Sequence, residues 1–173
     1  MYDYLRKLTP LPLIIAEALK LLGTVERAGA ANSPTIMAWA DEVGGKVEDV
    51  YRADSIPWCG LFMAVVAQRA GKVVPVDPLW ALNWTKFGVA AGQPMLGDVL
   101  TFVRKGGGHV ALYVGEDATA YHVLGGNQSD KVCFTRIAKE RLHRVRRPVY
   151  RVQPSTVRLY ILSASGGLSV NEA

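Results

Sequence analysis

The order of elements along the 173-residue chain predicts an α+β fold, with helices in the first half and an antiparallel sheet in the second. Residues 58–68 form an uncharged, largely apolar run that is typical of a buried central helix. After residue 98, short runs of β-branched and aromatic residues alternate with glycine turns, which is typical of a meander of strands. The two patterns together predict a buried helix packed on a sheet.

Three helices are expected before the sheet, and residues that favour helix starts and stops bound each of them. Pro34 suits a first helical position, while Gly23, Gly44 and Gly71 suit the stops. Cys59 lies in the first turn of the last helix. The expected helices cover 11–22, from Pro34 to about Gly44, and 58–70.

The strands are expected as short runs between glycine-rich turns, of which 106–108 and 125–126 are the clearest. Residues 75–94 lie between the helices and the sheet and are expected to form a loop. The expected strands cover 99–103, 109–114, 121–124 and 132–137, with a candidate fifth at 148–152.

The composition excludes several protein classes. Hydrophobic residues make up 50% of the chain and charged residues 20%, which excludes a disordered or low-complexity chain. The two cysteines exclude a disulfide-rich scaffold, and no CxxC or Cys/His zinc pattern is present. We expect one domain over 1–150 and a partly flexible C-terminal extension over 151–173, frayed from Ser163 onward.

The N-terminal apolar stretch faintly resembles the core of a signal peptide. Glu17 and Lys20 interrupt it, however, and no Ala-x-Ala cleavage site follows. No apolar run approaches the roughly 20 residues of a membrane-spanning helix. We therefore expect a monomer that is cytoplasmic when synthesised and has no stable membrane insertion.

The positive charge is concentrated near the end of the predicted sheet. Residues 131–151 contain eight Lys or Arg residues and one acid, Glu140, in a chain whose net charge is +5. Such a segment suits an anionic envelope surface or nucleic acid, or forms a solvated face with Arg stems packed on the core. Aromatic residues are sparse in it, so we expect no nucleic acid as a partner.

Cys59 is the candidate nucleophile. A thiol reacts as its thiolate, and a helix N-terminus or a nearby imidazolium lowers the thiol pKa. Pro57 suits a helix start, so we expect a helix N-terminus at Cys59 that lowers the pKa of its thiol. The imidazole must come from one of the three histidines of the chain, which are His109, His122 and His143.

His109 is the preferred partner because it opens a strand directly after three glycines. Arginine charges around His143 disfavour its cation, and His122 lies in mid-strand. A polar residue usually orients a catalytic imidazole. Asn127 is the first choice for that task, because it follows the next strand, and Gln128 is the substitute.

Four sequence blocks occur in a specific order. Together they resemble the papain-like cell-wall hydrolases of the CHAP and NlpC type, and especially a branch encoded by phages and prophages. The similarity runs from about Leu13 to about Tyr150. The blocks are PWCGLF at 57–62, GDVLTF at 97–102, GGHVALYV at 107–114 and VLGGNQ at 123–128.

The resemblance implies a papain-like fold and an endolysin-like enzyme that hydrolyses an amide bond in the stem peptide of bacterial peptidoglycan. Cys59 matches the nucleophile of that family, His109 the general base and acid, and Asn127 the orienting residue. Many relatives carry Glu two residues before the Asn, where this chain has Gly125. Such an enzyme would act on the wall or periplasm after release or delivery.

Other residues receive lesser expectations. The acid-rich calcium loop of some relatives is missing, so we expect no metal, and the mechanism needs no cofactor. Asp98 suits a structural turn contact, and Cys133 a core thiol. Trp80 is a further candidate for stacking on substrate. The candidates for the oxyanion hole or for substrate contact are Asp54, Trp58, Trp84 and Gln128.

Three other functions compete with wall hydrolysis. A papain-like site also suits an amidase or toxin that acts on a protein. A catalytically silent wall-binding phage module is a second alternative, although such a module needs neither Cys59 nor His109. A nucleic-acid binder rests on the basic segment alone and predicts a steep salt dependence.

Overall fold

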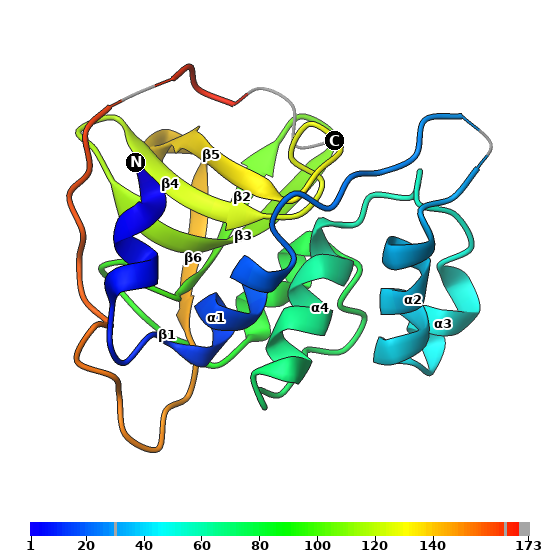
Figure 1. Cartoon of the computed structure of the whole chain (residues 1–173), viewed down its shortest axis with the longest axis horizontal. Helices are drawn as coiled ribbons and strands as arrows, with labels where there is room; N and C mark the ends of the chain where they lie inside the picture. The colour runs from blue at the N-terminus through cyan, green and yellow to red at the C-terminus, as the bar shows by residue number, and fades with distance from the viewer. Residues whose placement is uncertain (30, 165, 170–173) are drawn as a thin grey trace.

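Helices cover one face of an antiparallel sheet in the computed structural model, which describes residues 1–29, 31–164 and 166–169 (Figure 1). The sheet has six strands in the order β1-β6-β2-β3-β4-β5, and every pairing is antiparallel. This mixed architecture agrees with the predicted α+β class. Residue 30, in the segment between the first and second predicted helices, lies outside the described residues.

The three predicted helices are confirmed. Ser33 precedes the helix that begins at Pro34, and Gly44 ends that helix with a φ of 72°, a value that few side chains tolerate. A five-residue helix directly after Gly45 was not predicted. The helical segments are η1 (Tyr2–Lys7), α1 (Leu13–Lys20), α2 (Pro34–Val43), α3 (Lys46–Val50), α4 (Cys59–Arg69), η2 (Ala81–Lys86) and η3 (Lys139–Arg141).

The four main predicted strands are confirmed, and the candidate fifth is wrong. The last strand lies over 142–147 and ends before Pro148, which has no N–H to donate to a neighbouring strand. A two-residue strand also lies in the segment predicted as a loop. The strands are β1 (Val89–Ala90), β2 (Val99–Arg104), β3 (Gly107–Glu116), β4 (Ala120–Gly125), β5 (Cys133–Ala138) and β6 (Leu142–Arg147).

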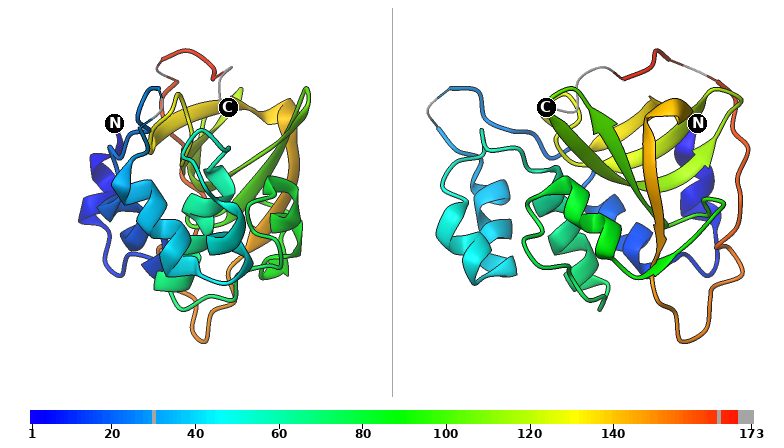
Figure 2. Two further views of the ribbon diagram at one scale, coloured as in Figure 1. Left: turned by 90° about the vertical axis from the view of Figure 1, so that its right-hand side faces the viewer. Right: turned by 180° about the vertical axis from the view of Figure 1, so that it is seen from behind.

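Helix α4 forms the centre of the larger hydrophobic core. Nine consecutive residues, from Cys59 to Ala67, are buried, as the uncharged run predicts. The helix packs between α1, α2 and the inner face of the sheet (Figures 1 and 2). A second core on the other face of the sheet contains Leu100, Phe102, Tyr113 and other strand residues. Among the described residues, no helix has the length and apolar character of a membrane span.

The extension after residue 150 lies along the sheet. Backbone hydrogen bonds join Glu116 at the end of β3 to Tyr160 and Leu162, at 2.9 and 2.8 Å. Farther on, the N–H of Ser169 donates to the carbonyl of Arg136 in β5, at 2.8 Å. The segment expected to be frayed therefore holds contacts with β5 as far as residue 169, and its residues 165 and 170–173 lie outside the described residues.

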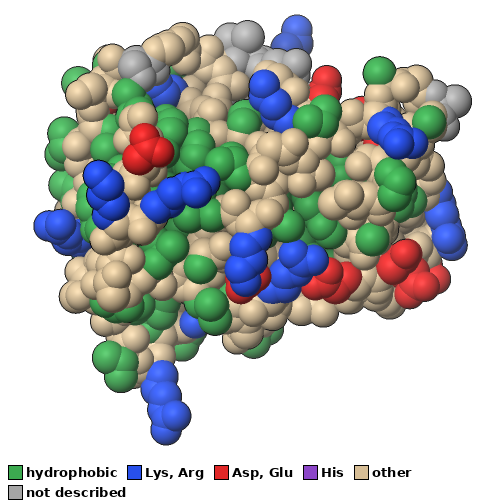
Figure 3. Space-filling model, in the orientation of Figure 1, with side chains coloured by type: hydrophobic (Ala, Val, Ile, Leu, Met, Phe, Trp, Pro, Cys, Tyr) green, Lys and Arg blue, Asp and Glu red, His purple; other side chains and the backbone are tan. Residues whose placement is uncertain are grey.

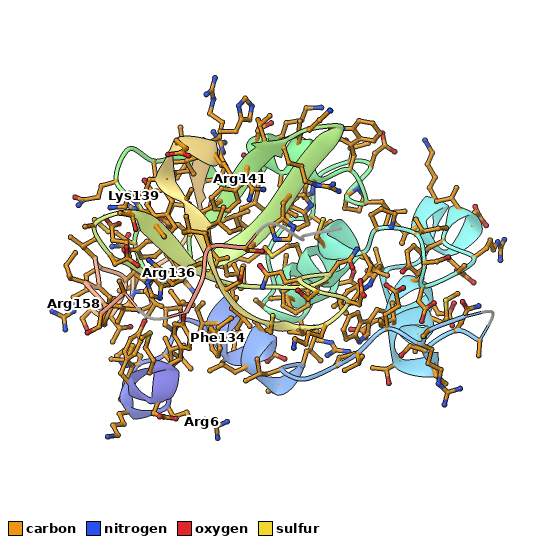
Figure 4. All side chains as sticks on the ribbon, turned by 90° about the horizontal axis from the view of Figure 1, so that it is seen from above. Arg6, Phe134, Arg136, Lys139, Arg141 and Arg158 are labelled. Carbon is orange, nitrogen blue, oxygen red and sulfur yellow. The ribbon has the colours of Figure 1, made fainter. Side chains whose placement is uncertain are left out.

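Most of the basic segment binds acceptors of this chain. Arg136 contacts Asp117, Lys139 contacts Glu116, and the Arg141 guanidinium donates to the carbonyl of Ser169. In Figure 4 these three basic side chains lie close together beside the C-terminal extension. Arg146 and Arg147 also bind acceptors within the chain. Most basic side chains of the segment therefore form hydrogen bonds or ion pairs within the fold.

Asp98 makes the structural turn contact expected from the sequence. Its carboxylate accepts the N–H of Met95 at 2.9 Å and two hydrogen bonds from Arg147, at 2.9 and 2.8 Å. The Asp98 side chain is fully buried. These contacts tie the turn before β2 to the end of β6.

Replacing Asp98 by alanine is expected to lower the free energy of unfolding by about 3 kcal/mol, because the Arg147 guanidinium loses its buried counter-charge. Urea denaturation followed by circular dichroism measures the loss. Asp41→Ala, on the exposed face of α2, is the matched control and should change stability by less than about 0.5 kcal/mol. Equal losses in the two variants would contradict this role of Asp98.

Candidate active site

Cys59 is the first residue of α4 and lies against the start of β3. Its side chain belongs to the core, and the residue is 3% exposed. The next residue must be glycine, since a Cβ at Gly60 would lie 2.3 Å from the carbonyl oxygen of Pro78. The 78–79 segment therefore packs directly on the first turn of α4, at the residue that follows Cys59.

The pKa of Cys59 differs from the sequence-based expectation. Burial raises the pKa of the thiol, and this effect outweighs the hydrogen bonds from the backbone N–H groups of Val110 and Gly60, which lower it. The charge of Arg104 also lowers this pKa. The helix start thus acts in the expected direction but does not prevail, so the thiol is protonated at neutral pH in this closed conformation.

This burial predicts how fast Cys59 reacts with iodoacetamide. In a Cys133→Ser variant, which leaves a single thiol, the alkylation rate should rise about tenfold for each pH unit between 6 and 8.5, because only the thiolate reacts. Mass spectrometry of the modified chain gives the rate. A rate that is already constant near pH 7 would mean that Cys59 exists as a thiolate at neutral pH.

His109 lies near the beginning of β3 and is fully buried. Its ring stacks beside that of Phe102, the residue paired with it on β2, with centroids 6.4 Å apart. The next residue in the strand, Val110, supplies the N–H that contacts the Cys59 thiol. Helix α4 and strand β3 therefore bring the nucleophile candidate next to the strand position that follows the histidine.

Gln128 forms a hydrogen bond with the ring of His109. Its Oε1 lies 3.1 Å from Nε2 of His109, while its Nε2 donates to the carbonyl of Cys133 at 2.5 Å. Because the Cys133 carbonyl only accepts, the amide must turn its NH2 group there and its oxygen to the ring. Nε2 of His109 must then carry the proton, and Nδ1 is the basic atom of the neutral ring.

The loop that carries Gln128 is held tightly on α4. A Cβ at Gly126 would lie 2.5 Å from the Cβ of Phe62, so only glycine permits this approach. Asn127, the first choice for the orienting task, is buried in the same loop with a φ of 54°. Gln128, the next residue of the loop, forms the hydrogen bond to Nε2 of His109 described above.

The other two histidines belong to different surroundings. His122 is fully buried and lies between the hydroxyl of Tyr2 and the carboxylate of Asp117, at 2.9 and 2.8 Å. Burial opposes ionisation of Asp117, but hydrogen bonds from Thr119, His122 and Arg136 lower its pKa well below the ordinary value. This network ties the N-terminal segment to the sheet. His143 lies half-buried on β6.

The remaining predicted site residues mostly have core contacts. Asp54 Oδ2 accepts the backbone N–H groups of Arg27 and Ser33, at 3.0 and 2.7 Å, and so braces the loop before α2. Trp58 and Trp84 are fully buried. Their indole N–H groups donate to Glu26 and to the carbonyl of Pro78, respectively. These three side chains therefore stabilise the fold through hydrogen bonds within the chain.

Trp80 is the tryptophan that is open to solvent, with 67% exposure. It lines a largely apolar groove of about 820 Å³ together with Ile56 and Pro57, the residues that lead into α4. Among the residues that the structure describes, no three His, Cys, Asp or Glu side chains gather as a metal ion would require.

The sequence reasoning missed Arg104 altogether. Its position at the end of β2, next to the glycine turn before His109, is the signal that could have been used. Cys133, predicted as a core thiol, is half-buried, and its carbonyl orients Gln128. In comparisons with known proteins, no family model and no curated protein matches the chain.

Proposed function

We propose that the chain is a papain-like cysteine amidohydrolase that cleaves an amide bond in the stem peptide of bacterial peptidoglycan. The observation that carries the chemistry is the thiol of Cys59, at a helix start and in contact with the N–H of Val110, beside a histidine whose tautomer Gln128 defines. The choice of substrate rests on the four sequence blocks. The protein would then act as a monomeric, endolysin-like lysis enzyme at the wall.

The proposed reaction begins when His109 removes the proton of the Cys59 thiol through its basic Nδ1. The thiolate attacks the amide carbonyl, and backbone N–H groups at the start of α4 stabilise the oxyanion. The imidazolium then gives its proton to the leaving amine, which departs as the C–N bond breaks. Water, activated by His109, hydrolyses the thioester and restores the thiol.

Because burial raises the thiol pKa, the proposed enzyme depends on proton transfer within the complex with substrate rather than on a preformed thiolate. The oxygen of Gln128 supports this step, since it stabilises the ring N–H as positive charge develops on the imidazole. Arg104 supports the negative charge on sulfur.

Digestion of purified peptidoglycan tests the proposal. Wild-type protein should release soluble fragments, and mass spectrometry should show the mass of one water added for each bond cleaved. The fragment masses distinguish cleavage at the glycan–peptide junction from cleavage within the peptide. An intact polymer after prolonged digestion, with a folded protein whose Cys59 can be alkylated, would contradict peptidoglycan as the substrate.

A further inference from the structure

Three loops meet at the C-terminal end of α4, and we call their exposed surface the valine face. The Lys72 Nζ donates to the carbonyl of Val149 at 2.6 Å and lies 4.7 Å from the centre of the Tyr150 ring. A small hollow of about 260 Å³ is lined by residues from all three loops. These loops cover 71–76, 86–90 and 148–152, and their surface is therefore continuous.

The apolar side chains of the valine face point into solvent. Val73 and Val152 are 88% and 84% exposed, the two highest values among the large hydrophobic residues in the described part of the chain. The other exposed valines of these loops are Val76, Val149 and Val89, with 73%, 60% and 51%. One exposed valine needs no explanation, but five on adjoining loops form an apolar surface that solvation alone does not favour.

The charges on these loops all have one sign. Lys72, Lys86 and Arg151 accompany the valines, and Arg69 at the end of α4 is already paired with Glu42. The stretches 69–76, 85–93 and 148–155 contain no Asp or Glu. In Figure 3, hydrophobic and basic side chains share the projection at the lower edge of the molecule. The face thus combines projecting apolar side chains with unopposed positive charge.

We propose that the valine face docks on the surface of an anionic lipid bilayer. A bilayer interface accepts apolar side chains that project singly, while its phosphates attract the surrounding cations. The face projects, and its hollow of about 260 Å³ is too small to receive an ordered protein segment. It also presents no open aromatic ring on which nucleic-acid bases could stack. Binding is peripheral, because these short valine side chains reach only the outer boundary of the acyl region.

Docking in this way orients the rest of the molecule. The valine face lies at the C-terminal end of α4, and Cys59 lies at the N-terminal end, about 15 Å away at 1.5 Å per residue. In Figure 1 the loops and the first turn of α4 accordingly lie at opposite ends of that helix. Bilayer contact would therefore leave the Cys59 end facing away from the lipid. The inference does not depend on the proposed function.

Vesicle sedimentation with the full chain tests the proposal. The probes are vesicles of pure phosphatidylcholine and vesicles with 30% phosphatidylglycerol. Wild-type protein and Cys59→Ala should bind the anionic vesicles equally. Val149→Ser/Val152→Ser and Lys86→Glu/Arg151→Glu should each lower the partition coefficient about tenfold. Val103→Ser/Lys105→Glu, which changes an exposed valine and lysine at the end of β2, is the matched control and should bind as wild type.

Three results would overturn the inference. The first is no sedimentation of wild-type protein with the anionic vesicles. The second is an equal loss in the control variant, since binding would then not involve this face. The third is normal binding by the serine variant with loss in the charge variant, which would identify a site for soluble polyanions instead of a bilayer. Circular dichroism of each variant ensures that a loss of binding is not a loss of fold.

Discussion

Replacing Cys59 by alanine should reduce amide-bond cleavage in peptidoglycan at least about 10⁴-fold, because the covalent route through a thioester disappears. The substitution removes one sulfur atom from a well-packed position, so the helix should remain folded. Release of soluble amino groups from purified peptidoglycan measures the rate, and mass spectrometry identifies the fragments.

Cys133→Ala is the matched control for this experiment. It also removes a thiol, but Gln128 keeps its main acceptor, the backbone carbonyl of residue 133. Its activity should stay within about threefold of wild type. If Cys59→Ala kept a tenth or more of the activity, Cys59 would not be the nucleophile. Loss of activity in both variants with loss of helical signal would indicate unfolding, and Cys59→Ser then separates chemistry from stability.

The elements predicted well from the sequence are those with local, repeated signals. The uncharged run before Gly71 identifies α4, and glycine turns delimit β2, β3 and β4. Strand β6 carries a weaker signal, because basic side chains flank its half-buried Leu142 and its buried Val145. The guanidinium groups of Arg146 and Arg147 donate to the carbonyl of Phe87 and the carboxylate of Asp98, which lie far away in the chain. These long-range contacts stabilise the strand, and a local sequence pattern cannot predict them.

The candidate site also combines features that the local sequence shows with features that depend on long-range packing. Cys59 and His109 stand out because their chemistry and flanking residues are local features. The protonation state of Cys59 cannot be read from local features, since burial by distant segments outweighs the effect of the helix start on the thiol pKa. Likewise, three of the four tryptophans are buried and Trp80 is open to solvent, a difference that long-range packing decides.

The choice between the two neighbouring amides also depends on three-dimensional structure. A positive φ at Asn127 turns the chain, so adjacent side chains leave the loop in different directions. The amide that reaches Nε2 of His109 is therefore that of Gln128. The sequence could identify both residues as candidates, and the structure adds that the amide oxygen of Gln128 lies within hydrogen-bond distance of the ring.

Replacing Gln128 by leucine should lower kcat for amide cleavage about 100-fold or more, with a smaller change in KM. Leucine has a similar volume but accepts no hydrogen bond, so the ring N–H of His109 loses its partner and the tautomer that leaves Nδ1 basic is no longer favoured. Nitrogen-15 NMR of the histidine ring checks this directly: wild type should show the proton on Nε2, and the variant a mixture.

Asn127→Gly is the matched control, because glycine tolerates the positive φ and only the side chain is removed. It should retain at least about a tenth of the wild-type kcat and the wild-type ring tautomer. Gln128→Glu adds a second test, since a carboxylate beside the ring stabilises the imidazolium and raises the His109 pKa. The acid limb of its pH–rate profile, which reports the neutral base, should therefore move to higher pH. A larger loss in Asn127→Gly than in Gln128→Leu would assign the orienting role to Asn127 instead.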